Sequence, residues 1–251
     1  MQNCLVLFQC QGSHLKPPTT IHNQQQHIRM FIRHPLFRLL NIQTLSSAIR
    51  LISIQPASPI MDPEVKRVIA FWFNRPPLEW IIAPEGLDAQ LKSEFGDLVL
   101  KARRNELDNW ATSPEGSVAI VTLLDQFTRN LFRGTAEAFS GDAKAFEVAT
   151  KAVAQDFDKQ VTVIQASAFY MCLMQQESLV SVIAARGLFE KLKERCESEE
   201  EHKWVGMGVP AAGRHLQQLL RFGRYPTRNA LLGRKNTEDE EMFLREHVSS
   251  L

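Results

Sequence analysis

Cysteine is scarce in this chain of 251 residues, and the four cysteines are scattered along it. None belongs to a Cys-x-x-Cys pair, so we expect neither a disulfide framework nor a zinc site. This usage favours a reducing compartment, and the cytoplasm is the simplest location. Long apolar runs are also missing, because no stretch reaches the roughly 18 apolar residues that a membrane-crossing helix requires. The sequence therefore predicts no membrane span.

Acidic residues are absent from residues 1–60, which nevertheless contain five of the 29 basic residues. The remainder, residues 61–251, holds 24 basic and 28 acidic side chains and is mildly acidic. That net charge does not favour nucleic acid as a partner. The contrast predicts two parts: a basic N-terminal tail, residues 1–60, and a single all-helical domain, residues 61–251.

The tail contains a glutamine run and four of the seven histidines. We expect it to be mostly disordered, because such a segment buries too little apolar surface to offset its chain entropy. Residues 28–54 mix arginine with large apolar residues, as a mitochondrial presequence does, although Pro35 interrupts them. The tail is thus either a targeting segment, which makes the protein mitochondrial, or an inert or spurious extension that ends before Met61.

From Asp62 onward, capping residues and apolar spacing predict helices. Asp62 followed by Pro63 is a typical helix start, and Thr237 with Glu240 forms a capping box for the last helix. Other helices are expected to start at Asp88, at Ser113 with an end at Gly134, and at Pro210 with an end at Gly223, with further segments at 140–154, 159–176 and 178–196. The acidic run 197–201 is expected to be a solvated loop.

The fold class follows from these helices and from the lack of strand-like alternation. Short connections between successive helices make neighbours antiparallel, which predicts an array of antiparallel helical hairpins. Such an array is tetratricopeptide-like, although the repeat of about 34 residues that marks those proteins is not explicit.

One predicted helix carries an unusual row of charges. Asp125, Arg129 and Arg133 are spaced four residues apart and are expected to share one helix face beside apolar neighbours. Arginine binds carboxylates or phosphates with two parallel hydrogen bonds. The row is therefore either an ion network that fixes helix packing or the lining of an anion site.

A second basic cluster, residues 221–235, has five basic side chains, no acid and two glycines. Arg224, Arg228 and Asn229 lie at its centre, where a loop with converging arginines could bind a phosphate. Interleaved aromatic residues also suit single-stranded RNA. Alternatively, the arginines cap helix ends and pair with the acidic body.

Glu177 is a further candidate, either as a general base or as an arginine partner. No histidine or cysteine near it completes a nucleophile arrangement, so the partner role is favoured. No complete catalytic set, metal site or cofactor motif is recognised anywhere in the sequence.

Several of these segments together resemble a known family. The Phe71-Trp-Phe73 triplet, LLDQFTRNLFRGTAEAF at 123–139, Glu177 and RFGRYPTRNALLGR at 221–234 are similar to the domain-of-unknown-function family 924. The resemblance spans residues 64–246 and implies an all-helical, tetratricopeptide-like fold, without implying an activity. The family's usual His-Ser-Glu is Gln175-Gln176-Glu177 here, and its Phe-Pro-His-Arg-Asn is Tyr225-Pro-Thr-Arg-Asn229. Both family histidines are missing.

The leading hypothesis is a binding or scaffold protein with an internal pocket for a small anionic ligand or for the carboxylate of a protein partner. Arginines would contact the anion, and the acids would orient them. The pocket residues are expected to be Asp125, Arg129, Arg133, Glu177, Arg224, Arg228 and Asn229. Two alternatives are a hydrolase-like or accessory enzyme that acts on a small acidic metabolite, and RNA binding through 221–235.

Overall fold

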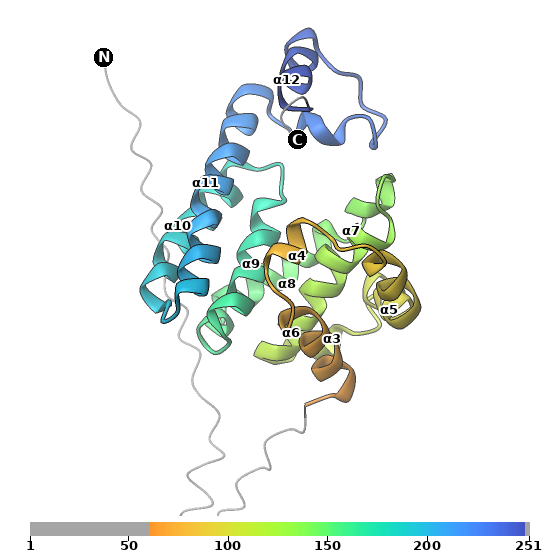
Figure 1. Ribbon diagram of the computed structural model, residues 1–251, viewed down its shortest axis with the longest axis vertical. Helices are drawn as coiled ribbons and strands as arrows, with labels where there is room; N and C mark the ends of the chain where they lie inside the picture. Colours follow the sequence, from red (N-terminus) through yellow and green to blue (C-terminus); the bar gives the residue numbers. More distant parts are fainter. Residues whose placement is uncertain (1–60, 249–251) are drawn as a thin grey trace, which may run out of the picture. The chain divides into compact units, whose positions relative to one another are not determined.

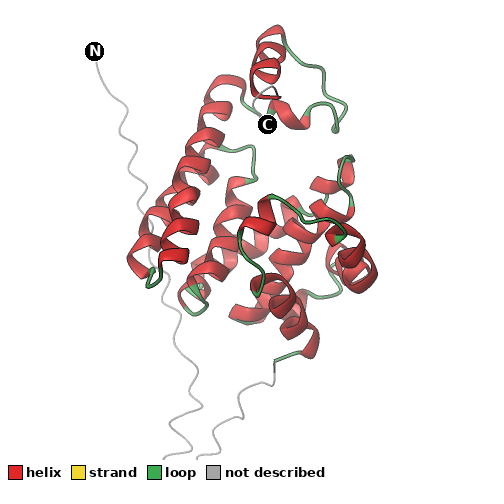
Figure 2. Ribbon diagram, viewed as in Figure 1, coloured by secondary structure: helices red, strands yellow, loops and turns green. Residues whose placement is uncertain are grey.

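The computed structural model describes residues 61–248, and its regular elements are all helices, with no β-strand in that range (Figures 1 and 2). The predictions for residues 1–60 lie outside the described residues. The α-helices are α3 (Pro63–Phe73), α4 (Leu78–Ile81), α5 (Leu87–Arg103), α6 (Pro114–Val121), α7 (Thr128–Leu131), α8 (Asp142–Ala154), α9 (Val163–Met174), α10 (Leu179–Leu192), α11 (Glu199–Phe222) and α12 (Glu238–Val248). The all-α prediction is confirmed.

Helix starts follow the capping residues. Asp62 accepts a hydrogen bond from the backbone N–H of Glu64 and Pro63 opens α3, as expected. The capping box of the last helix is also confirmed, because Thr237 and Glu240 each bind the other's backbone N–H. These side chains satisfy N–H groups that have no partner within the helix.

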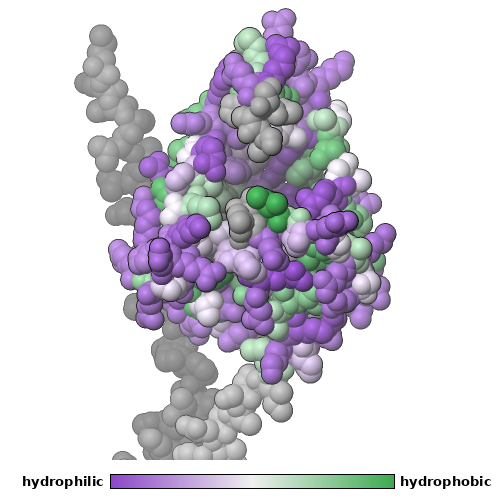
Figure 3. All heavy atoms as spheres, in the orientation of Figure 1, coloured by the Kyte–Doolittle hydropathy of each residue, from purple (hydrophilic) through white to green (hydrophobic). Residues whose placement is uncertain are grey.

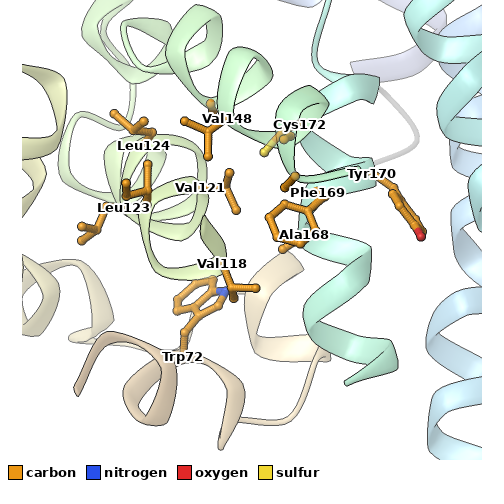
Figure 4. Packing of buried hydrophobic residues seen from close by; sticks show 14 of the residues in the cluster. Trp72, Val118, Val121, Leu123, Leu124, Val148, Ala168, Phe169, Tyr170 and Cys172 are labelled. Carbon is orange, nitrogen blue, oxygen red and sulfur yellow. The ribbon is translucent and has the colours of Figure 1, made fainter. Parts of the chain in front are cut away.

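Successive helices pack against one another. Contacts connect α8 with α9, α9 with α10, and α10 with α11. Helices α9, α10 and α11 lie side by side in Figure 1. Their apolar faces form one core, in which side chains from α6, α8 and α9 converge on Val121 (Figure 4). The face drawn in Figure 3 is mostly hydrophilic. Tetratricopeptide-like pairing remains a prediction.

The start of α11 differs from the prediction. The helix begins at Glu199, so Pro210 lies inside it, and residues 199–201 of the acidic run form its first turn and not a loop. Ser198 and Glu201 form a capping box there, and acidic side chains in a first turn also interact favourably with the helix dipole. The helix ends at Gly223, as predicted, in the left-handed conformation (φ 70°).

The helix predicted to run from Ser113 to Gly134 is not uniform. It is α-helical to Val121, widens into a π-helix at Thr122–Phe127, and ends as α7 at Leu131. The hydroxyl of Thr128 donates to the carbonyl of Leu123, five residues earlier (2.9 Å). The expectation that Asp125, Arg129 and Arg133 share one face is wrong, because the last of them lies beyond the helix end.

Candidate functional site: a cavity lined by two arginines

Arg129 occupies the centre of a small ion network. Its Nε and Nη2 atoms donate to Oδ1 of Asp125 at 3.2 and 3.0 Å, and Nη2 also donates to Oδ1 of Asp142 at 2.7 Å. The Asp125 side chain is only 2% exposed, so it lies behind the arginine. The π-helix that carries Asp125 and the start of α8 that carries Asp142 thus meet at one guanidinium.

Asp142 joins the two arginine-rich segments of the chain. Its Oδ2 accepts from Nη1 of Arg228 at 3.2 Å, across 86 residues of sequence. Nη2 of Arg228 donates to Oε1 of Gln175 (2.7 Å), which fixes the other side of this guanidinium. Burial raises the pKa of Asp142, and the positive charges of Arg129 and Arg228 oppose this rise only in part.

A close backbone approach places Asp142 in the network. A Cβ atom added to the preceding residue, Gly141, would lie 2.1 Å from the carbonyl oxygen of Leu124. Only glycine therefore allows the start of α8 to pack directly on the π-helix. This contact holds Asp142 near Asp125, even though both are acidic, and Arg129 lies between them.

The two arginines open onto a cavity of about 240 Å³. Its lining comes from five parts of the chain: Arg129, Phe139, Gln175, His215, Gln218, Tyr225, Thr227 and Arg228. None of these described lining residues is acidic. Nη1 of Arg129 and Nε of Arg228 make no hydrogen bond within residues 61–248. The cavity is thus lined by positive charge with N–H donors to spare.

Aromatic rings support both guanidinium groups. The ring centre of Phe139 lies 5.2 Å from the guanidinium carbon of Arg129 and 4.8 Å from that of Arg228. Tyr225 lies 4.9 Å from Arg228 on another side. Cation–π contacts of this kind restrict the side chains and keep their N–H groups aimed in fixed directions.

Two further polar side chains enter the cavity from α11. Nδ1 of His215 lies 2.9 Å from the carbonyl oxygen of Ala211. Because a carbonyl only accepts, Nδ1 carries the proton and Nε2 of the neutral ring is an acceptor. Burial lowers the pKa of His215, and the charges of Arg228 and other nearby arginines lower it further. Oε1 of Gln218 is buried without a partner in the described part of the chain.

Two of the predicted pocket residues lie elsewhere. Arg133 pairs with Asp88 at 2.9 Å on the exposed surface. Glu177 accepts from Nη1 of Arg234 at 2.8 Å and from the backbone N–H of Tyr225 at 2.9 Å. Burial acts to raise the pKa of Glu177, but these hydrogen bonds outweigh it and the net pKa is lowered. Glu177 is therefore an arginine partner in the folded protein.

Arg224 and Asn229 belong to a separate network around Glu240, which is 1% exposed. Arg224 binds both carboxylate oxygens of Glu240, at 2.6 and 2.8 Å. Asn229 is fully buried and donates to Oδ1 of Asn236 at 2.8 Å. Of the seven predicted pocket residues, the structure thus brings Asp125, Arg129 and Arg228 together and leaves four outside.

Sequence reasoning missed Asp142, the residue that joins the network. A local signal existed, because an aspartate directly after glycine is common at a helix start. Nothing nearby in sequence indicated its two arginine partners. His215 and Gln218 were missed as cavity residues for a similar reason, since their spacing on α11 is that of any amphipathic helix.

Comparison with known proteins assigns the family. The sequence profile of "Bacterial protein of unknown function (DUF924)" matches residues 68–247. The chain belongs to the DUF924 family. A solved structure of a protein of unknown function, ATU0120 from Agrobacterium tumefaciens, is 31% identical, covers 73% of this chain and 97% of that chain, and has a TM-score of 0.66. No curated protein matches the chain.

The cavity is lined by Gln175 and Thr227, the two positions at which the family resemblance leads us to expect histidine. Neither an amide nor a hydroxyl titrates near neutral pH, so these two positions cannot supply acid–base catalysis. Both can form hydrogen bonds, and Gln175 already orients Arg228. Across residues 61–248, no group of three or more His, Cys, Asp or Glu side chains could hold a metal ion. Within the same range, no helix is both long and apolar enough to cross a membrane.

Proposed function

We propose that this protein binds a small anion, either a free metabolite or the carboxylate of a peptide, between Arg129 and Arg228. The observation that carries the proposal is the convergence of two arginines from distant segments on one carboxylate, with a cavity on their open side. A binding or scaffold protein needs such a preorganised contact and no chemistry beyond it.

The direction of the hydrogen bonds supports an anionic ligand. Asp125 and Asp142 neutralise the two arginines, so net charge alone does not attract the anion. The acids are not among the residues that line the cavity, however, whereas both arginines and Thr227 are. Guanidinium N–H groups that are already fixed in place lose little entropy when they bind carboxylate or phosphate.

The two alternative functions receive less support. An enzyme that used Asp125 or Glu177 as a base would need a free carboxylate with a raised pKa, but one is sealed behind Arg129 and the other is ion-paired with a lowered pKa. RNA binding through 221–235 would need free positive charge there. Four of its five basic side chains are instead paired with acids: Arg221, Arg224, Arg228 and Arg234.

Titration calorimetry with phosphate, sulfate and acetate tests the proposal. We expect one anion per chain, and the loss of one charged hydrogen bond in Arg228→Gln to weaken binding by about tenfold or more. Thr227→Glu should weaken binding similarly without breaking the ion network, because it adds a negative charge to an exposed wall of the cavity.

Arg133→Gln is the matched control. It removes an arginine from the same stretch of chain, but one that pairs with Asp88 outside the cavity, so affinity should not change. If none of the three anions binds, or if Arg133→Gln weakens binding as much as Arg228→Gln, the proposal is wrong.

A further inference from the structure

A second, apolar cavity of about 480 Å³ lies among α9, α10 and α11. Three methionines line it, Met171 and Met174 from α9 and Met207 from α11, together with Trp204 and Phe189. Its volume is typical of small-molecule sites, and methionine side chains adapt to ligands of irregular shape. The proposed anion site does not use this cavity.

The two cavities share one side of α9. Met171 and Met174 line the apolar cavity, and the next residue, Gln175, lines the arginine cavity. Residues three and four apart in a helix lie on the same face, so these side chains form one row. The row changes from apolar to polar at the C-terminal end of α9.

The same order occurs on α11. Met207, Ala211 and Arg214 line the apolar cavity, while His215 and Gln218 line the arginine cavity further along. At about 100° per residue, these positions fall on one side of the helix. The two cavities are therefore neighbours along both helices, with Met174 next to Gln175 on one and Arg214 next to His215 on the other.

We propose that the two neighbouring cavities together bind one amphipathic molecule, with an anionic group at Arg129 and Arg228 and an apolar body in the methionine-lined cavity. This inference rests on the proposed anion binding and adds the class of ligand. An anion without an apolar body would leave the larger cavity empty, and an apolar molecule without charge would leave the arginine N–H groups without a ligand.

Arg214 supports a negatively charged head group. Its exposed side chain lines the apolar cavity close to the arginine cavity, and it has no ion-pair partner in residues 61–248. A cation beside the apolar body attracts an amphiphile whose charge is negative and repels one whose charge is positive. The ligand is therefore an apolar carboxylate or phosphate monoester, and not an alkylamine.

Calorimetry on the full chain with acetate, hexanoate and decanoate tests this, alongside alkyl phosphates of matched length, all below their micelle concentrations. We expect one site per chain and an affinity that rises by about fourfold for each methylene that becomes buried. A rise in affinity with chain length in either series supports the proposal, and the series that shows the rise identifies the head group. Decylamine should not bind.

Met207→Gln keeps the size of a side chain on the cavity wall and makes it polar. It should reduce the affinity for decanoate by about tenfold, while acetate binds as before. Leu220→Gln is the matched control, because Leu220 is an exposed apolar residue of the same helix outside both cavities, and it should change neither affinity.

The outcomes separate this inference from the proposed function. If acetate or phosphate binds but chain length brings no gain, the amphipathic ligand is wrong and anion binding stands. A chain-length gain that survives Met207→Gln, or equal binding of decylamine and decanoate, also overturns the inference. If phosphate, sulfate and acetate all fail to bind, the proposed function itself fails.

Discussion

Two arginine–carboxylate networks in this protein use the same groups differently. A single arginine, Arg224, binds both carboxylate oxygens of Glu240, and Oε2 also accepts a hydrogen bond from the backbone N–H of Thr237. Asp142 instead gives one oxygen to Arg129 and the other to Arg228. The Glu240 network lies outside the cavity and is called the closed network below. The two arginines of the other network, the open network, line the cavity, so pairing alone does not separate a structural arginine from one that lines a cavity.

The largest effect is expected when the shared carboxylate of the open network is removed. Asp142→Ala leaves two largely buried arginines facing each other, which should lower the free energy of unfolding by about 3 kcal/mol. Urea denaturation measures this loss. Phosphate should restore more stability to the variant than to the wild type, because an anion in the cavity can replace the carboxylate. A loss below about 1 kcal/mol would mean that the network contributes little.

Gly141→Ala tests whether the close approach of α8 to the π-helix positions the open network. Its Cβ atom would clash with the backbone of Leu124, so something must shift, at a cost of about 2 kcal/mol. Anion affinity should fall as well, since Asp142 moves with the helix start. The control is Gly213→Ala within α11, where a Cβ meets nothing within 4 Å and where alanine favours the helix.

The contribution of the closed network to stability should depend on pH in the acid range. Hydrogen bonds from Arg224 lower the pKa of Glu240 from 4.5 to about 2. A carboxyl group whose pKa is lowered by folding stabilises the protein fully above its unfolded pKa and loses that contribution as pH falls toward its folded pKa. The difference in stability between wild type and Glu240→Gln should therefore shrink between pH 4.5 and about 2. Anion affinity at neutral pH should not change, which distinguishes this network from that of Asp142.

The smallest effect is expected at Arg133, which belongs to neither network. Its ion pair with Asp88 is exposed on both sides, with 58% and 41% of the side chains accessible. Arg133→Gln should change the free energy of unfolding by less than about 0.5 kcal/mol, within the range of surface ion pairs. Thermal or urea unfolding provides the measurement, and a larger loss would show that the exposed pair is coupled to the cavity.

The sequence predicted what depends on local signals. Caps such as Asp62 and the Thr237–Glu240 box act within one turn of helix, so they could be recognised without the fold. The arginines of both motifs were found because of their unusual density. Pro210 predicts a helix start, because proline is tolerated best in the first turn, but it lies in the middle of a long helix.

Long-range placement could not be predicted in the same way. Asp142 is important because of two partners, 13 and 86 residues away, that only the folded chain brings together. The π-helix depends on one turn adopting a wider hydrogen-bonding pattern, which apolar spacing does not indicate. Spacing and motif order predict that Arg133 and Glu177 line the pocket. In the structure, Arg133 pairs with Asp88 and Glu177 pairs with Arg234.

The π-helix at Thr122–Phe127 also determines how Arg129 is turned relative to Asp142. A π-turn holds about one residue more than an α-turn, and each residue in an α-helix corresponds to about 100° of rotation. If the same residues formed a regular α-helix, Arg129 would be turned about 100° away from Asp142. Every side chain of the network would still be present, but out of phase. The cavity thus depends on the wider hydrogen-bonding pattern of this turn as well as on the identity of its residues.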